Sequence, residues 1–342
     1  MVIDSPILST VDYDSPGKHV GRLKIPRSTN LSGWANLFVP IICLQSGPGP
    51  TALVLGGNHG DEYEGQVAAL NLARELESSD VQGRLIIIPC LSIEASRAGT
   101  RHWPSGANFN RSFPGSPAGP ANEQLADYLT RVLFPISDVV IDIHSGGRSA
   151  LFLPCSHMHL VPDPAQRRAM AEAMLAWNTD YHFLYIDIAG SGLLPNEAER
   201  QRKVVVTTEM GGGGHTTARI HRLAASGLRN VLRHFKILPG AVETRASLGL
   251  PDALILSAID PADYVLSPES GLFETHVDPG DRVEAGQPLG RMWFIERPDR
   301  APEPITTPRA GVVACVRAIA STAQGDCVAV VGQVTDRREL VG

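Results

Sequence analysis

The sequence lacks most of the features that mark secreted, membrane-spanning and nucleic-acid-binding proteins. Its 342 residues include five cysteines, an odd number with no C-x-x-C pair, which indicates reduced thiols and disfavours a cysteine-type zinc site. No apolar run approaches the ~20 residues that span a bilayer, and the first residues lack the basic and apolar regions of a signal peptide. We therefore expect a cytoplasmic protein, in which any metal must be held by histidine and carboxylate side chains.

Charge is equally modest. The net charge is −6 and is spread along the chain, without a basic block, so nucleic acid is not expected as a partner, and neither is a membrane. What the chain does have is an apolar content of 43%, ample for a real core. Its length suits one large domain with an appendage, or two domains.

From residue 51 to about residue 235, segments with strand and helix patterns alternate. Strand patterns cover residues 53–55, 83–89, 138–144 and 203–209, and helix patterns cover residues 65–76, 122–133, 164–177 and 215–235. Such alternation predicts an α/β fold with a mostly parallel sheet and helices on both of its faces.

The flanking segments read as β structure. Residues 1–48 contain short apolar runs with prolines in or near them, which predicts an N-terminal β extension. Residues 239–257 read as a connector, and turn signals then recur every ~8–12 residues, as in a small β-sandwich or barrel. We therefore place a catalytic α/β domain at residues 1–240 and a small all-β domain at residues 241–342.

The segment Gly-Gly-Asn-His-Gly-Asp-Glu-Tyr-Glu-Gly at residues 56–65 follows a strand pattern and precedes a helix pattern. His59 and Glu62 are three residues apart, so an imidazole and a carboxylate can converge on one point. Nitrogen and oxygen ligands with one open position suit a divalent metal such as zinc. On its own, H-x-x-E fits an acidic helix cap beside an incidental histidine equally well, so the other segments decide.

Two further strand patterns end in polar residues. His144 ends one of them, with Asp142 on the same side of the strand, and Glu209 ends another, just before four glycines. Ligands of such sheets bind outside the carboxyl ends of the strands, so His59, His144 and Glu209 are expected on one rim. There His144 could be a third metal ligand oriented by Asp142, and Glu209 could move a proton from water to a leaving amine. The alternatives are a strand-capping histidine and a surface salt bridge.

A polar loop rich in glycine and proline covers residues 101–115. Arg111 with Asn110 is a candidate clamp for a substrate carboxylate, because a guanidinium donates two parallel hydrogen bonds to that group. Arg101 could bind the same anion or polarise a scissile carbonyl. An ordinary solvated loop is the alternative.

Taken in order, these segments resemble the succinylglutamate desuccinylase/aspartoacylase family of zinc hydrolases. The G-x-x-H-G-x-E pattern is met by residues 56–62, D/N-x-N-R by residues 108–111, a strand ending in D-x-H by residues 142–144, and a later strand-end glutamate by Glu209. The resemblance implies a carboxypeptidase-like fold in which the sheet is mixed, and an enzyme that hydrolyses linear amides of N-acyl amino acids.

The resemblance also implies the role of each site residue. One zinc ion would lie on His59, Glu62 and His144, with Glu209 as general acid/base. Asn110 and Arg111 would hold the substrate carboxylate, and Arg101 the carbonyl oxygen or the carboxylate. The stretch from Arg101 to Asn110 is longer here than is typical of aspartoacylases.

A closer likeness lies in three segments, Asp-Ser-Pro-Gly-Lys-His-Val-Gly-Arg-Leu at residues 14–23, the segment at residues 56–65, and Asn-Phe-Asn-Arg-Ser-Phe-Pro-Gly at residues 108–115. In these the chain resembles the branch of the family that deacetylates Nα-acetyl-L-2,4-diaminobutyrate in ectoine breakdown. The side-chain ammonium of that small-molecule substrate would need an acidic partner. Asp187 and Glu197 could serve, although we expect both on the solvated surface. A metallocarboxypeptidase, another N-acyl amino acid deacylase and a non-catalytic metal-dependent binding module are the alternatives. The acyl group, the native metal and the oligomeric state, a homo-oligomer included, stay open.

Overall fold

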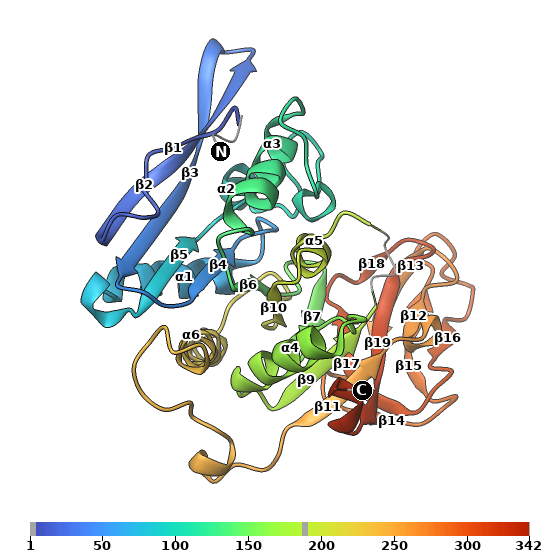
Figure 1. The fold of residues 1–342 in the computed structure, drawn as a ribbon. Helices are drawn as coiled ribbons and strands as arrows, with labels where there is room; N and C mark the ends of the chain where they lie inside the picture. The colour runs from blue at the N-terminus through green and yellow to red at the C-terminus, as the bar shows by residue number, and fades with distance from the viewer. Residues whose placement is uncertain (1–4, 187–190, 342) are drawn as a thin grey trace.

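A large mixed sheet organises the computed structural model, which describes residues 5–186 and 191–341 (Figure 1). Its strands lie in the order β1 (Leu8–Ser9), β2 (Gly17–Thr29), β3 (Ser32–Ser46), β5 (Gly83–Ile88), β4 (Thr51–Gly56), β6 (Val139–His144), β10 (Val204–Glu209), β8 (Cys155–Met158), β9 (Tyr181–Tyr185), β11 (Leu254–Ala258), β19 (Cys327–Thr335), β17 (Gly311–Arg317) and β14 (Arg282–Val283). Two short strands join at the side: β7 (Ala150–Phe152) pairs with β17, and β12 (Tyr264–Leu266) with β19.

Parallel pairing is confined to the middle of this sheet. Strand β4 is parallel to β5 and β6, β6 to β10, and β9 to β8 and β11. The other pairings are antiparallel, including the long β2–β3 hairpin and the contact of β8 with β10. The sequence predicted a mostly parallel sheet. The observed sheet is mixed as a whole, because antiparallel strands from both ends of the chain extend its parallel centre.

Helices cover both faces of the sheet. Residues Leu53 and Leu55 of β4 belong to the apolar cluster that includes α3 (Ala121–Tyr128) and α5 (Leu194–Arg200), whereas Ala52 and Val54 belong to the cluster of α1 (Tyr63–Glu75) and α6 (Ala218–His234). This division follows from the two-residue period of a strand. The remaining helices are α2 (Ile93–Ala98), α4 (Pro164–Ala176) and α7 (Arg338–Val341), and α3 continues into a π-helical segment, Leu129–Leu133.

The first turn of α1 lies unusually close to β6. A Cβ atom on Gly65 would stand 2.4 Å from the carbonyl oxygen of Ile143, which is shorter than any real contact. Glycine at this position therefore lets α1 begin against the carboxyl end of β6. As a result, Glu62, just before the helix, lies beside His144 at the end of that strand.

The strands after α6 divide between two sheets. Strands β11, β14, β17 and β19 extend the large sheet, whereas β13 (Gly271–Thr275), β15 (Pro288–Trp293), β16 (Glu303–Thr306) and β18 (Ser321–Thr322) form a separate antiparallel sheet. One apolar cluster contains residues of both, among them Phe273, Met292 and Val331. The domain boundary at residue 240 stays a prediction, and the expected connector contains β11.

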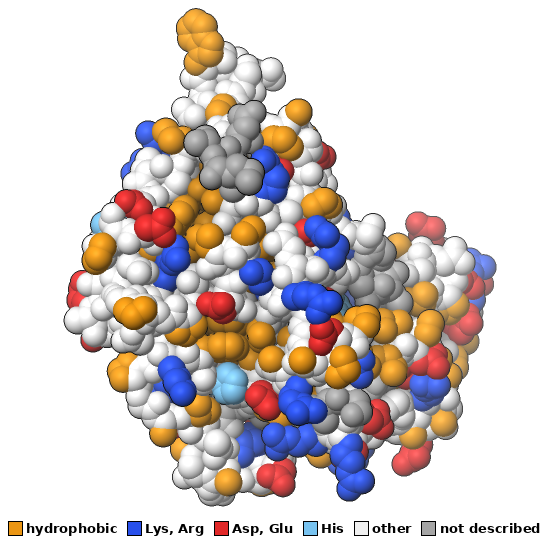
Figure 2. Space-filling model, in the orientation of Figure 1, with side chains coloured by type: hydrophobic (Ala, Val, Ile, Leu, Met, Phe, Trp, Pro, Cys, Tyr) orange, Lys and Arg blue, Asp and Glu red, His pale blue; other side chains and the backbone are white. Residues whose placement is uncertain are grey.

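On the face of the molecule shown in Figure 2, basic and acidic side chains are interspersed, without a large patch of one sign. The β2–β3 hairpin projects from the body, and its tip carries Leu31 and Trp34, both 99% exposed. Across the described residues, no helix combines the length and the apolar character needed to cross a bilayer.

Candidate active site

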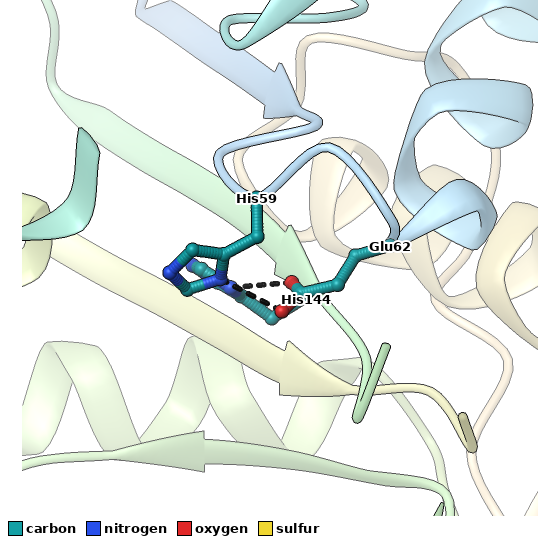
Figure 3. A group of neighbouring side chains, drawn as sticks. All are labelled: His59, Glu62 and His144. Atoms are coloured by element: carbon teal, nitrogen blue, oxygen red, sulfur yellow. Dashed lines mark hydrogen bonds and ion pairs between the residues drawn. The ribbon is translucent and has the colours of Figure 1, made fainter. Parts of the chain in front are cut away.

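Three side chains that the sequence analysis named as possible metal ligands meet at the rim of the sheet, from two segments that are distant in the sequence. His59 lies in the turn after β4, Glu62 just before α1, and His144 at the end of β6, and Figure 3 shows the two imidazoles beside the Glu62 carboxylate. The Nδ1 atoms of His59 and His144 lie 2.7 and 2.8 Å from the two carboxylate oxygens. All three residues are buried, and one ligand atom from each lies within 4.8 Å of the others.

Hydrogen bonds on the far side of each ring determine which nitrogen faces Glu62. The Nε2 atom of His59 lies 3.2 Å from Oδ1 of Asn108, an acceptor that also receives the backbone N–H of Asn110. The Nε2 atom of His144 lies 2.8 Å from Oδ2 of the buried Asp142. Both Nε2 atoms are therefore donors, so neutral rings direct the Nδ1 lone pairs toward Glu62.

Lone pairs that face a carboxylate at such short distances require a positive charge between them. Burial opposes the charged form of both histidines, and it lowers the pKa of His59. The carboxylates of Asp142 and Glu62 nevertheless raise the pKa of His144 well above its ordinary value. A proton on His144 supplies that charge for one of the two contacts when no metal is present, and Arg101 donates to the carboxylate oxygen that faces His59. A divalent cation would replace that proton, so the donor set fits a metal.

Neighbouring groups hold these three side chains in place. Asp142 is completely buried and also accepts a hydrogen bond from Nδ2 of Asn58 at 2.8 Å. Arg101, which is partly exposed, donates from Nη1 to Oε1 of Glu62 at 3.0 Å. Carboxylates behind a metal-binding histidine fix its ring and raise its basicity, which is the position of Asp142 relative to His144.

Glu209 ends β10 directly beside His144, with which it is in register. Burial raises the pKa of Glu209 to about 8, and the nearby Glu62 carboxylate adds to the rise, while His144 and Arg101 oppose it. Its Oε2 atom is buried and has no hydrogen-bond partner among the described residues. The glycines that follow, residues 211–214, all have φ between +74° and +134°, a region that favours glycine, so the run is a backbone requirement of this turn.

A cavity of about 140 Å³ joins these groups. Among the described residues its lining consists of His59, Glu62, Arg101, Asn110, Arg111, His144, His157, Tyr185, Leu193, Pro195, Thr207 and Glu209. The seven residues to which the family resemblance gave a role toward the metal, the substrate carboxylate or carbonyl, or the proton all lie in this set. Asn110 Oδ1 accepts the backbone N–H of Leu194, and Arg111 donates to the carbonyl of Asn110.

The acidic residues suggested for a substrate ammonium do not line the described part of this cavity. Glu197 is buried and accepts two hydrogen bonds from Arg200, at 2.7 and 2.8 Å. Asp187 lies outside the described residues. The cavity instead contains His157, Tyr185 and Thr207, which the sequence analysis did not single out. The sequence offered only a weak sign of His157, a histidine in the short segment Cys-Ser-His-Met at residues 155–158. This segment forms the buried strand β8.

A mixed α/β sheet with two histidines and a carboxylate clustered at its rim, opposite a buried glutamate, defines a class of amide hydrolases. The comparisons agree with this class. Residues 48–235 match the succinylglutamate desuccinylase/aspartoacylase catalytic domain. Over 335 residues the chain is 40% identical to N-alpha-acetyl-L-2,4-diaminobutyric acid deacetylase of Halomonas elongata, covering 97% of this chain and 96% of that protein. The chain therefore belongs to the succinylglutamate desuccinylase/aspartoacylase family, whose members are N-acyl amino acid amidohydrolases.

Solved structures show the same likeness. The product-bound ectoine utilization protein EutE (DoeB) from Ruegeria pomeroyi is 40% identical, with a TM-score of 0.92 and coverage of 96% of this chain and 99% of that one. A succinylglutamate desuccinylase/aspartoacylase from Rhodobacter sphaeroides is 34% identical, with a TM-score of 0.92 and coverage of 97% and 100%. The whole described chain therefore has the architecture of the family, including the strands after α6.

Proposed function

We propose that this chain is a zinc-dependent deacetylase that hydrolyses Nα-acetyl-L-2,4-diaminobutyrate to acetate and L-2,4-diaminobutyrate. The observation that carries the proposal is the convergence of two Nδ1 lone pairs and a carboxylate in a cavity that also contains Glu209. The substrate is taken from the Halomonas elongata relative, whose name states that acyl amino acid. Its place in ectoine breakdown agrees with the Ruegeria pomeroyi structure.

His59, Glu62 and His144 would hold the zinc ion. When bound, zinc supplies Lewis-acid chemistry, because it lowers the pKa of water to about 7 and polarises a carbonyl oxygen. Asp142 and Asn108 keep the two imidazoles in the tautomer that offers Nδ1. Two imidazoles and a carboxylate are the protein ligands typical of a catalytic zinc site, which leaves one position open.

Glu209 would move the proton. Its carboxylate takes a proton from the attacking water and later delivers it to the nitrogen of the leaving amine, so that the carbon–nitrogen bond breaks with a neutral amine. The pKa of about 8 keeps the carboxyl protonated at neutral pH in the metal-free protein. A cation on the nearby ligands would lower that pKa toward neutrality, the range in which one group can both accept and release a proton.

The arginines of the cavity would position the substrate. Arg111 and Asn110 line the cavity together, and we assign them to the α-carboxylate, which a guanidinium holds through two hydrogen bonds. Arg101 contacts Glu62 while its side chain stays 41% exposed. From there its guanidinium can turn to the carbonyl oxygen or to the carboxylate, so we assign it to stabilising the charge that develops during attack.

A deacylation screen with zinc-loaded protein tests the proposal. Nα-acetyl-L-2,4-diaminobutyrate should release acetate, and N-acetylaspartate, N-succinylglutamate and the isomer acetylated at the 4-amino group should react at least tenfold more slowly. Release of a C-terminal amino acid from peptides without acetate production would indicate a carboxypeptidase instead. If the protein binds zinc and ligand but does not turn over any acylated amino acid, it is a non-catalytic binding module.

A further inference from the structure

His157 occupies a position in the cavity that the proposed chemistry does not use. Strand β8 runs antiparallel to β10, with His157 opposite Thr207 and Cys155 opposite Glu209. Glu209 in turn is in register with His144 on β6. His157 therefore lies on the same face of the sheet as Glu209, one row deeper. Two residues along a strand correspond to about 7 Å, so a substrate held beside Glu209 can extend its side chain toward His157.

The hydrogen bonds of Thr207 determine the tautomer of His157. The Thr207 hydroxyl lies 2.9 Å from the carbonyl oxygen of His157, which can only accept, and 2.7 Å from Nδ1 of the same residue. A hydroxyl has one proton. Both contacts are hydrogen bonds only if that proton goes to the carbonyl and Nδ1–H donates to the hydroxyl. The Nε2 atom of His157 is then a bare acceptor.

This acceptor has no partner within the part of the chain that the structure describes. The His157 side chain is buried, and its Nε2 atom forms no hydrogen bond there. Burial is the main reason why the pKa of His157 lies well below its ordinary value. The ring therefore stays neutral and keeps its lone pair. A buried acceptor without a partner destabilises a protein, so the group is suited to a ligand that brings a donor.

Three other residues of the cavity indicate what kind of ligand fits. Tyr185 lines the cavity and lies edge-on to His157, with the ring centroids 4.7 Å apart, and aromatic rings attract cations. Arg101 and Arg111 line the same cavity and account for the anionic group of a substrate. A ligand that satisfies all of these groups has a carboxylate at one end and an ammonium at the other.

We propose that His157 determines specificity, and that its Nε2 atom accepts a hydrogen bond from the side-chain ammonium of the substrate. This inference rests on the proposed function, whose substrate has a free 4-amino group, and it assigns recognition of that group to His157 rather than to Glu197, which is bonded to Arg200.

Two substitutions separate the acceptor from the packing of the ring. In His157→Asn the amide nitrogen takes the place of Nδ1 and can still donate to Thr207, but nothing replaces Nε2. In His157→Gln the amide oxygen reaches the place of Nε2. His182→Asn is a matched control, because His182 is also buried and bonds through Nδ1, to the Ser156 hydroxyl, and does not line the described part of the cavity.

The assay compares kcat/KM for Nα-acetyl-L-2,4-diaminobutyrate with that for Nα-acetyl-L-2-aminobutyrate, which lacks only the ammonium. We expect His157→Asn to lose about 10- to 100-fold on the diamino substrate, mainly through KM, because hydrogen bonds to charged groups are worth that factor. On the monoamino substrate we expect a loss of about threefold at most. His157→Gln should recover most of the loss, and His182→Asn should keep the ratio. Equal losses on both substrates, or no loss on either, would overturn the inference.

Binding of the two free amino acids separates this inference from the proposed function. Calorimetry with zinc-loaded protein should show that wild type prefers L-2,4-diaminobutyrate to L-2-aminobutyrate by about tenfold or more, and that His157→Asn abolishes the preference. If wild type does not deacetylate the diamino substrate, the proposed function is wrong, and this binding preference still decides the role of His157. Equal affinity of wild type for both amino acids would overturn it.

Discussion

Replacing Glu209 with glutamine should slow the enzyme and, in the metal-free protein, stabilise it. Removal of a positioned general acid/base costs about 10²- to 10⁴-fold in kcat, which corresponds to roughly 3–5 kcal/mol of transition-state free energy. Glutamine has the same shape but cannot exchange the proton. The substrate-binding groups stay in place, so KM should change by no more than about threefold.

The gain in stability follows from the pKa of Glu209, which rises from 4.5 to about 8 on folding. Below pH 4.5 the carboxyl is protonated in both the folded and the unfolded chain, so it adds no pH dependence. As the pH rises from 4.5 to 8, the unfolded chain loses the proton while the folded chain keeps it, and folding therefore becomes less favourable. At about 1.4 kcal/mol for each pKa unit, the cost at pH 8 is roughly 4 kcal/mol, and glutamine removes it.

Urea unfolding of the zinc-free proteins at several pH values measures this difference. The free energy of unfolding of Glu209→Gln should exceed that of wild type by several kcal/mol at pH 8, and the gap should close toward pH 4.5. Glu64→Gln is the matched control for activity. Glu64 is another buried carboxyl whose pKa is raised by burial, but it does not line the described active-site cavity, so this variant should keep kcat within a few-fold. Unchanged kcat in Glu209→Gln, or a stability gap independent of pH, would refute the reasoning.

Three further outcomes follow from the contacts of single residues. Asp142→Asn should weaken zinc affinity about 10- to 100-fold in a chelator competition, because Asp142 fixes the His144 ring; unchanged affinity would contradict that role. His182 is buried with a pKa lowered to about 3, so it should contribute to a loss of stability as the pH falls from 6.5 toward 3, where only the unfolded chain takes up the proton. His182→Asn should flatten that part of the pH profile of unfolding, and an identical profile would contradict this. Gly65→Ala should lower the free energy of unfolding by about 1–3 kcal/mol, because the added Cβ atom would clash with Ile143. A variant as stable as wild type would show that α1 can move away from β6 without cost.

The rim of the sheet was predictable because it depends on local pattern and one topological rule. His59 was predicted at this rim because a strand pattern is followed by a glycine turn. His144 and Glu209 were predicted there because each ends a strand pattern. In the structure all three lie at carboxyl ends of the parallel strands β4, β6 and β10. Alternating strands and helices place such ends on one edge, so no knowledge of long-range contacts was needed.

The deeper part of the cavity was not predictable by that rule. His157 lies on β8, a four-residue strand that enters the sheet antiparallel to β10. All four residues of this strand are buried. Their sequence, Cys-Ser-His-Met, lacks the alternation of polar and apolar residues by which a half-exposed strand is predicted. The contact of Asn108 with His59 depends in the same way on the path of a loop, which no periodicity describes.

The sheet outside its parallel centre also depends on distant partners. β11 lies in a segment predicted as a connector, yet it pairs with both β9 and β19. Strand pairing is decided by which edges are free once the rest of the chain has folded, and a run of five residues carries little information about that choice. Glu197, predicted as a solvated residue, is buried and accepts a hydrogen bond from Arg200. Its burial also depends on a distant contact, because α5 packs on the sheet.

The most direct test of the central claim is the position of the metal. Crystals of the zinc-loaded protein, measured on both sides of the zinc absorption edge, should show one anomalous peak per chain, at about 2.0–2.2 Å from Nδ1 of His59, Nδ1 of His144 and a carboxylate oxygen of Glu62. A peak at any other group of side chains, or coordination through the Nε2 atoms, would contradict the account.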